Sequence, residues 1–183
     1  MASIIDIANR GLTLLGADPI TALADDTKEG RAVNRMYETT RNKLLRDHPW
    51  NFAMVRVALA ANVTAPIWDY TNAFDLPSAC LRIIEVDTTE EWQVEGRQIV
   101  SDAAAPLNIL YVAEITDTEQ YDAQFLNLFA IRLAADLAFD LTNSRPIAAD
   151  MENKYFLALR DARLVDAQES LSADEDTWLE ARA

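Results

Sequence analysis

The chain has 183 residues, of which 30 are Asp or Glu and 16 are Lys or Arg, so its formal net charge is −14. Hydrophobic residues make up 50% of the chain, which suits one folded domain or one domain with an insertion. One Cys and one His exclude an intrachain disulfide and a zinc site built from several histidines. Four Gly disfavour glycine-rich phosphate loops, and the acidity argues against general binding of DNA or anionic membranes.

The beginning of the chain carries no targeting pattern. Residues 1–6 lack the basic region of a secretory signal, and Asp6 and Asn9 interrupt the apolar run. No stretch of 18 apolar residues occurs in the sequence. We therefore expect a soluble protein that is made in the cytoplasm and has no membrane partner.

Two helices are predicted before residue 49. Ser3 with Asp6 resembles a capping box, and apolar residues then repeat at helical spacing as far as Gly16, which is placed to end the first helix. A second capping-box pattern, Asp26 with Glu29, precedes a helix that runs from about Lys28 to Asp47. Pro49 ends this helix, because a proline disfavours helical geometry in the residue before it.

The middle of the chain changes to β-branched and aromatic residues. Alternating apolar side chains predict a strand over 53–59, and the runs 81–86 and 107–112 also read as strands. Residues 92–100 predict a tight hairpin that turns near Glu95-Gly96. Together these segments predict a small, mainly antiparallel β unit.

Helical spacing returns at about Thr118, where a long amphipathic helix is predicted. Residues 143–146 form a turn that opens a last helix, and an acidic stretch with an isolated Trp follows Ser170. The predicted fold class is therefore α+β and mainly α, with a four-helix bundle core, an inserted antiparallel β unit and an acidic tail. Its predicted bounds are 1–48 and 116–171 for the bundle, 49–115 for the β unit and 172–183 for the tail.

The residue types that carry most enzyme chemistry are scarce here. His48 lies at a helix end before Pro49, and Cys80 stands in an apolar context, so both are interpreted as packing residues. Carboxylate pairs such as Asp25-Asp26 are numerous, but an acid-rich chain produces them without any function. We predict no catalytic, cofactor or metal site.

Charge is distributed unevenly along the sequence. Residues 28–46 hold six basic and two acidic side chains, net +4, whereas residues 161–183 hold seven acidic and two basic ones, net −5. Such opposite patches suit a contact within the chain or between copies, and two solvated helix faces are the alternative. The predicted interface residues are Arg31, Arg35, Arg46, Asp174, Glu175, Asp176 and Trp178.

Several short motifs occur in an order that resembles a known family. The first of them are Leu14–Ile20, Tyr37 with Arg41, HPWNFA at 48–53, FDLP at 74–77 followed by Cys80-Leu81-Arg82 and Val86, and VEGRQI at 94–99. Later come Phe125, the pairs at 133–134, 137–138 and 141–142, Tyr155 and the ending at 162–169. The pattern resembles the tail tubular protein A family of short-tailed bacteriophages and covers roughly residues 3–170. HPWNFA and LPxxCLR are its most telling parts, and the acidic tail lies outside it.

The resemblance implies a structural virion protein and not an enzyme. Members of this family combine a helical bundle with a β region and form a ring, usually of twelve copies, between the portal protein and the tail nozzle protein. The ring surrounds the channel through which DNA leaves, without binding the DNA specifically. The chain would then be made in the host bacterial cytoplasm and reside in the virion tail. The alternatives are another layer of the head–tail connector and a tail component with glycan-hydrolase activity.

Overall fold

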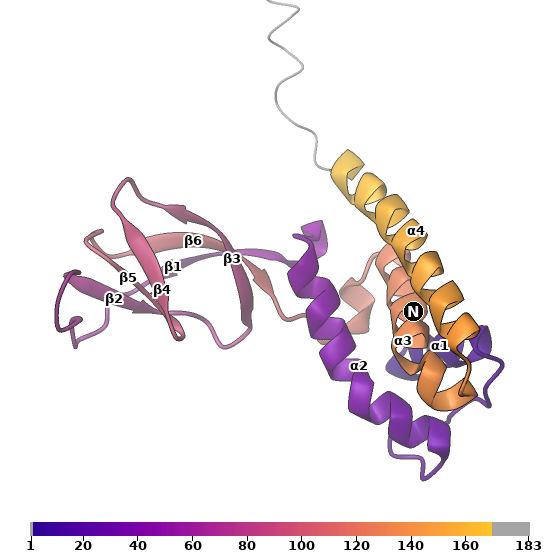
Figure 1. Cartoon of the computed structure of the whole chain (residues 1–183). Coiled ribbons are helices and arrows are strands. Elements are labelled where there is room, and N and C mark those ends of the chain that lie inside the picture. The colour runs from indigo at the N-terminus through magenta and orange to yellow at the C-terminus, as the bar shows by residue number, and fades with distance from the viewer. Residues whose placement is uncertain (1, 170–183) are drawn as a thin grey trace, which may run out of the picture. The chain divides into compact units, whose positions relative to one another are not determined.

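The computed structural model describes residues 2–169, and Figure 1 shows its helices and strands. The described chain is an α+β protein with four α-helices and two three-stranded antiparallel sheets. It divides into two compact units: a helical unit of residues 2–41 and 118–169, and a β unit of residues 42–117. The predicted tail, residues 172–183, lies outside the described residues.

The first helix, α1 (Ile4–Leu14), is fixed at both ends in the way that the sequence predicts. The Ser3 hydroxyl accepts a hydrogen bond from the Asp6 backbone N–H, and the Asp6 carboxylate accepts one from the Ser3 N–H. Gly16 takes a φ of 65°, and the N–H groups of Gly16 and of the next residue donate to carbonyls in the last turn. The capping box and the glycine ending are therefore both confirmed.

The second helix, α2 (Lys28–Asp47), has the predicted bounds but not the predicted cap. The Gly30 N–H donates to the Thr27 hydroxyl at 3.0 Å, and the Thr27 carbonyl accepts the first bond of the helix. Thr27 is thus the N-cap residue. The prediction of a capping box between Asp26 and Glu29 is wrong, because Thr27, directly before the first helical residue, makes the capping hydrogen bonds.

The third helix, α3 (Ala123–Thr142), contacts both α1 and α4 (Arg145–Glu169). Its buried stripe is apolar, and its large members are Phe125, Leu128, Phe129, Leu133 and Leu137. The helix α1 approaches α3 so closely that a Cβ on Gly11 would lie 3.0 Å from the Ala130 carbonyl oxygen. The predicted turn before α4 is also present, since Asn143 takes a left-handed conformation with a φ of 51°.

Side chains attach α2 to α3 within the helical unit. The Tyr37 and Phe129 rings lie 4.8 Å apart between centroids, and the Thr40 hydroxyl donates to the Asp136 carboxylate at 2.8 Å. At the start of α2, the Lys28 ammonium donates to the Leu141 carbonyl at 2.9 Å. No helix among residues 2–169 is both long and apolar enough to cross a membrane.

The β unit contains two antiparallel sheets. One has the order β1–β6–β3, formed by β1 (Met54–Leu59), β6 (Leu107–Ala113) and β3 (Cys80–Asp87). The other has the order β2–β5–β4, formed by β2 (Asn72–Asp75), β5 (Gln98–Ser101) and β4 (Trp92–Glu95). Both sheets contribute to one core, whose buried members include Leu59, Phe74, Ile99, Leu107 and Ile109.

The predicted strands and the predicted hairpin are confirmed, with one strand missed. β4 and β5 pair in register from Trp92↔Ser101 to Glu95↔Gln98, which is the predicted hairpin. The missed strand, β2, has only four residues, and two of them are polar. It is held at a sheet edge by its pairing with β5 and by the buried Phe74. So short a segment carries no alternating pattern that could have revealed it.

Candidate functional site

Two of the predicted interface arginines lie on the helical unit and already have acidic partners there. Arg31 forms an ion pair with Asp26, and the Arg35 guanidinium lies 3.8 Å from the Asp140 carboxylate. The two arginine side chains are 61% and 70% exposed, and pairs so open to water contribute little to stability. Both arginines could therefore exchange these partners for carboxylates of another molecule at small cost.

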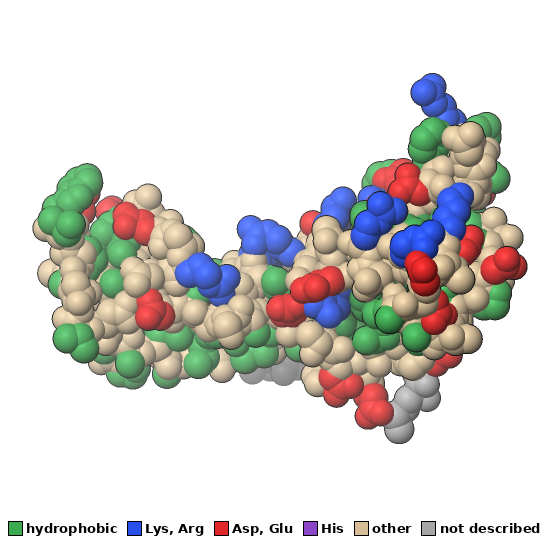
Figure 2. Space-filling model, turned by 90° about the horizontal axis from the view of Figure 1, so that it is seen from below, with side chains coloured by type: hydrophobic (Ala, Val, Ile, Leu, Met, Phe, Trp, Pro, Cys, Tyr) green, Lys and Arg blue, Asp and Glu red, His purple; other side chains and the backbone are tan. Residues whose placement is uncertain are grey.

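The remaining basic side chains of α2 do not form one continuous basic surface. Arg41 is only 8% exposed and lies 3.9 Å from the Glu38 carboxylate, and Lys28 is bound to a backbone carbonyl. Figure 2 shows the same alternation, with Asp and Glu side chains among the Lys and Arg side chains over the helices. The net +4 of this helix is thus distributed over separate, largely paired positions.

The third predicted arginine, Arg46, belongs to the β unit and lines a pocket there. Arg46 is about 16 Å along the helix axis from Arg35, at 1.5 Å per residue. Its guanidinium donates to the Leu81 carbonyl at the start of β3. The pocket has a volume of 390 Å³ and is lined by Arg46, Arg82 and Arg97 together with apolar side chains that include Leu76, Ile83, Trp92 and Val94. We call it the arginine pocket.

The three guanidinium groups of the arginine pocket face no carboxylate of the described residues. Arg97 donates to the backbone carbonyls of Pro77 at 2.6 Å and Ser78 at 3.2 Å. The Nε of Arg82 is buried and has no hydrogen-bond partner in the described part of the chain. No acidic residue lines the pocket, and none of the three arginines forms an ion pair within residues 2–169. The sequence could not reveal this group, since only the packing of the end of α2, β3 and the β4–β5 hairpin brings the three positions together.

A charged network in the helical unit joins three helices. The Arg132 guanidinium lies 2.5 Å from the Asp136 carboxylate and 3.1 Å from the Glu152 carboxylate, and it stacks over the Tyr155 ring at 4.8 Å. Thr40 donates to Asp136 from α2. Burial disfavours the charged guanidinium, but the two carboxylates outweigh burial and raise the pKa of Arg132. We interpret this network as a structural connection.

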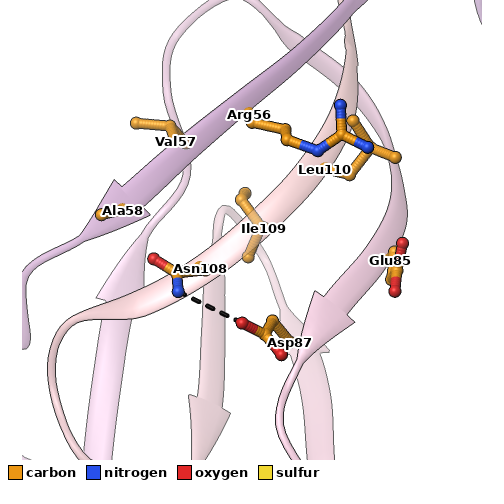
Figure 3. Close-up of a pocket in the computed structure, with 8 residues that line it drawn as sticks. All are labelled: Arg56, Val57, Ala58, Glu85, Asp87, Asn108, Ile109 and Leu110. Atoms are coloured by element: carbon orange, nitrogen blue, oxygen red, sulfur yellow. Dashed lines mark hydrogen bonds between the residues drawn. The ribbon is translucent and has the colours of Figure 1, made fainter.

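The outer face of the β1–β6–β3 sheet holds another pocket, of 470 Å³ (Figure 3). Asn108 donates to the Asp87 carboxylate at 3.2 Å, and Arg56 lies in register with Leu110. Glu85 and Asp87 project from the same strand and are exposed to water. The general acid of a glycosidase lies in an apolar pocket, which raises its pKa. Glu85 and Asp87 lack such an environment, because both are exposed to water.

The only His and the only Cys have packing roles, as predicted. The His48 ring lies edge-on to Trp50 at 4.5 Å, and the buried Trp50 indole donates to the Leu44 carbonyl at 2.9 Å. Cys80 is buried in the core of the β unit, and burial raises the pKa of its thiol against the opposing influence of Arg97 and Arg46. Among the described residues, no cluster of three His, Cys, Asp or Glu could hold a metal ion.

The other predicted interface residues, Asp174, Glu175, Asp176 and Trp178, lie outside the described residues. The structure therefore leaves their pairing with the basic helix a prediction. No protein-family model and no curated protein matches this chain.

Proposed function

We propose that the chain is a structural adaptor protein of a short-tailed bacteriophage, located in the virion tail. In this proposal its four helices act as one bundle that carries the β unit. Copies of the chain assemble into a ring, of twelve members as in the family that the sequence resembles. The ring joins the portal protein to the tail nozzle protein and surrounds the DNA channel.

One observation supports the proposal most: the motifs that carry the family resemblance are joined to one another by hydrogen bonds. The LPxxCLR and VEGRQI segments are joined by the hydrogen bond from the Leu76 N–H to the Arg97 carbonyl, at 2.9 Å, and by the bonds that Arg97 donates. The end of α2, directly before HPWNFA, is joined to the same place by Arg46 and the Leu81 carbonyl. Motifs separated by tens of residues thus form one packed region, which supports a shared architecture.

The surfaces of the chain support assembly in a ring. A closed ring needs two different complementary patches on each copy, because its interfaces are heterologous. Arg31, Arg35 and the arginine pocket supply positive patches, and in this proposal the acidic residues of the range 161–183 supply the complementary negative patch on a neighbouring copy. The excess of carboxylates would keep a passing polyanion from being held, so DNA would move through without specific binding.

A structural role also accounts for the positions of the reactive side chains. His48 is engaged with Trp50, and Cys80 is packed in a core that raises its thiol pKa. A nucleophile of this kind needs a lowered pKa and access to solvent. We therefore propose no enzymatic activity for this chain.

The proposal is tested by the mass of the purified chain with and without a portal protein from the same phage. Native mass spectrometry should show a complex that gains about twelve copies of 20.5 kDa when the portal ring is present. Electron microscopy of that complex should show a closed ring on one face of the portal. A chain that remains unbound at micromolar concentrations of portal would refute the adaptor role.

Two alternatives make different predictions. Another connector layer would bind the portal only after a first adaptor had bound, so the order of addition separates it from the proposal. A glycan hydrolase would release sugars from host polysaccharide, and substituting the exposed pair Glu85→Gln and Asp87→Asn would abolish the release. The pair is named because it lines the pocket on the outer sheet face.

A further inference from the structure

The arginine pocket suits a negatively charged ligand, and no described residue of this chain supplies one there. Arg46, Arg82 and Arg97 line one pocket to which no described carboxylate contributes, although the chain has 30 Asp and Glu. The buried Nε of Arg82 lacks a hydrogen-bond partner among the described residues, and an unsatisfied buried donor is costly. A bound carboxylate would balance the positive charge of the three guanidinium groups.

The walls of the pocket narrow the chemistry of its ligand. Trp92 and Val94 on β4 are exposed apolar side chains, and Leu76 and Ile83 add further apolar surface. A ligand that fits such a site combines carboxylates with an apolar or aromatic group, as an acidic peptide does. A nucleic acid strand fits poorly, because its phosphates would approach a chain with a net charge of −14.

We propose that the arginine pocket binds the chain's own acidic segment, residues 172–183. This segment carries Asp174, Glu175 and Asp176 directly before Thr177, Trp178 and Leu179, so charge and an aromatic anchor are close together. The carboxylates pair with the three guanidinium groups, and Trp178 packs against the apolar wall.

This pairing differs from a contact with Arg31 and Arg35 in the first part of α2. Arg31 and Arg35 already have Asp26 and Asp140 as partners, whereas the pocket arginines have no acidic partner within the described residues. The proposal does not rest on the adaptor role. In a ring, however, a segment supplied by a neighbouring copy would link adjacent subunits.

The test uses the full chain with a photo-reactive residue in the acidic segment. Leu179 is replaced by p-benzoylphenylalanine, the sample is irradiated, and the cross-linked peptides are identified by mass spectrometry. Cross-links should concentrate on residues 76–97. A mixture of isotope-labelled and unlabelled chains shows whether the same copy or a neighbouring copy supplies the segment, and either result supports the pairing.

The arginines and the acids are then removed separately. Arg82→Gln should lower the cross-link yield at residues 76–97 by about fivefold or more, because charge-assisted hydrogen bonds are lost. The matched control is Arg56→Gln, which removes one exposed arginine that lines the other pocket, on β1, and should leave the yield unchanged. Circular dichroism of each variant verifies that it is folded.

A second variant keeps the test informative if Arg82→Gln does not fold. Asp174→Asn, Glu175→Gln and Asp176→Asn together remove three of the four acidic side chains of residues 172–183 without altering any described residue, and they should lower the same yield. Cross-links centred on residues 28–41 of α2, or a yield that resists both the arginine and the acid substitutions, would overturn the pairing. If the unsubstituted chain forms these cross-links but does not bind the portal, only the adaptor role is refuted, and the pairing stands.

Discussion

Replacing Asp136 with Asn should destabilise the helical unit by about 2 kcal/mol. The substitution removes the carboxylate 2.5 Å from the Arg132 guanidinium, where both side chains are only 13% exposed. Breaking a fully buried ion pair by removing one partner costs about 3–5 kcal/mol. The cost is smaller here because Glu152, which is 42% exposed, still lies 3.1 Å from the arginine. The amide oxygen that replaces the carboxylate would also still accept the hydrogen bond from Thr40.

The assay is urea unfolding at pH 7, followed by circular dichroism at 222 nm because the change lies among helices. With a slope of about 2 kcal/mol per molar urea, the midpoint should fall by about 1 M. The control Glu152→Gln removes the more exposed partner and should cost less than about 1 kcal/mol. Both variants keep the size of the side chain, so the comparison isolates the charge.

A double substitution, Arg132→Met with Asp136→Leu, completes the test. An apolar pair of similar volume avoids the uncompensated charge, so it should be more stable than Asp136→Asn alone. A loss below about 0.5 kcal/mol for Asp136→Asn would refute the reasoning, because so small a change is typical of an exposed position. So would a double variant that is no more stable than the single one.

Four further predictions concern single features of the chain. Gly16→Ala should lower the unfolding free energy by about 1 kcal/mol in urea titrations, because alanine is strained at a φ of 65°. The Cys80 thiol should react with a disulfide reagent at pH 8 far more slowly in the folded chain than in 6 M urea, because burial raises its pKa; equal rates would contradict its burial. Two side-chain amides hold the pKa of Asp75 below its ordinary value, so its contribution to stability is full near neutral pH and is lost as the pH falls through the folded pKa. The stability of Asp75→Asn should therefore fall less than that of the unsubstituted chain between pH 5 and 3. Arg31→Glu with Arg35→Glu should impair ring formation or portal binding, and an unchanged assembly mass would remove these arginines from the interface.

The distribution of charge changes how the acidity of the chain is interpreted. A net charge of −14 suggests a surface that repels other acidic molecules, yet the arginine pocket holds three arginines without acidic partners among the described residues. Five of the eight arginines in the described helical unit have such partners. The place most open to a carboxylate is therefore the arginine pocket and not the part of the basic helix that carries Arg31 and Arg35.

Local patterns in the sequence determined the helices and the hairpin. The capping box of Ser3 and Asp6, the bounds 28–47 of α2 and the turn near Gly96 all depend on residues within a few positions of one another. Such features follow from backbone geometry and side-chain spacing alone, so they can be predicted without knowledge of the rest of the chain.

Tertiary structure decided which distant residues meet. The strand β2 exists because its partner β5 and the core around Phe74 hold it, and its own four residues carry no pattern. Arg46, Arg82 and Arg97 meet because the end of α2, β3 and the β4–β5 hairpin pack around one pocket. Which strands pair depends on long-range contacts, which the order of residues along the chain does not display. The composition and local motifs thus determined an acidic α+β chain, whereas packing decided where that chain presents positive charge.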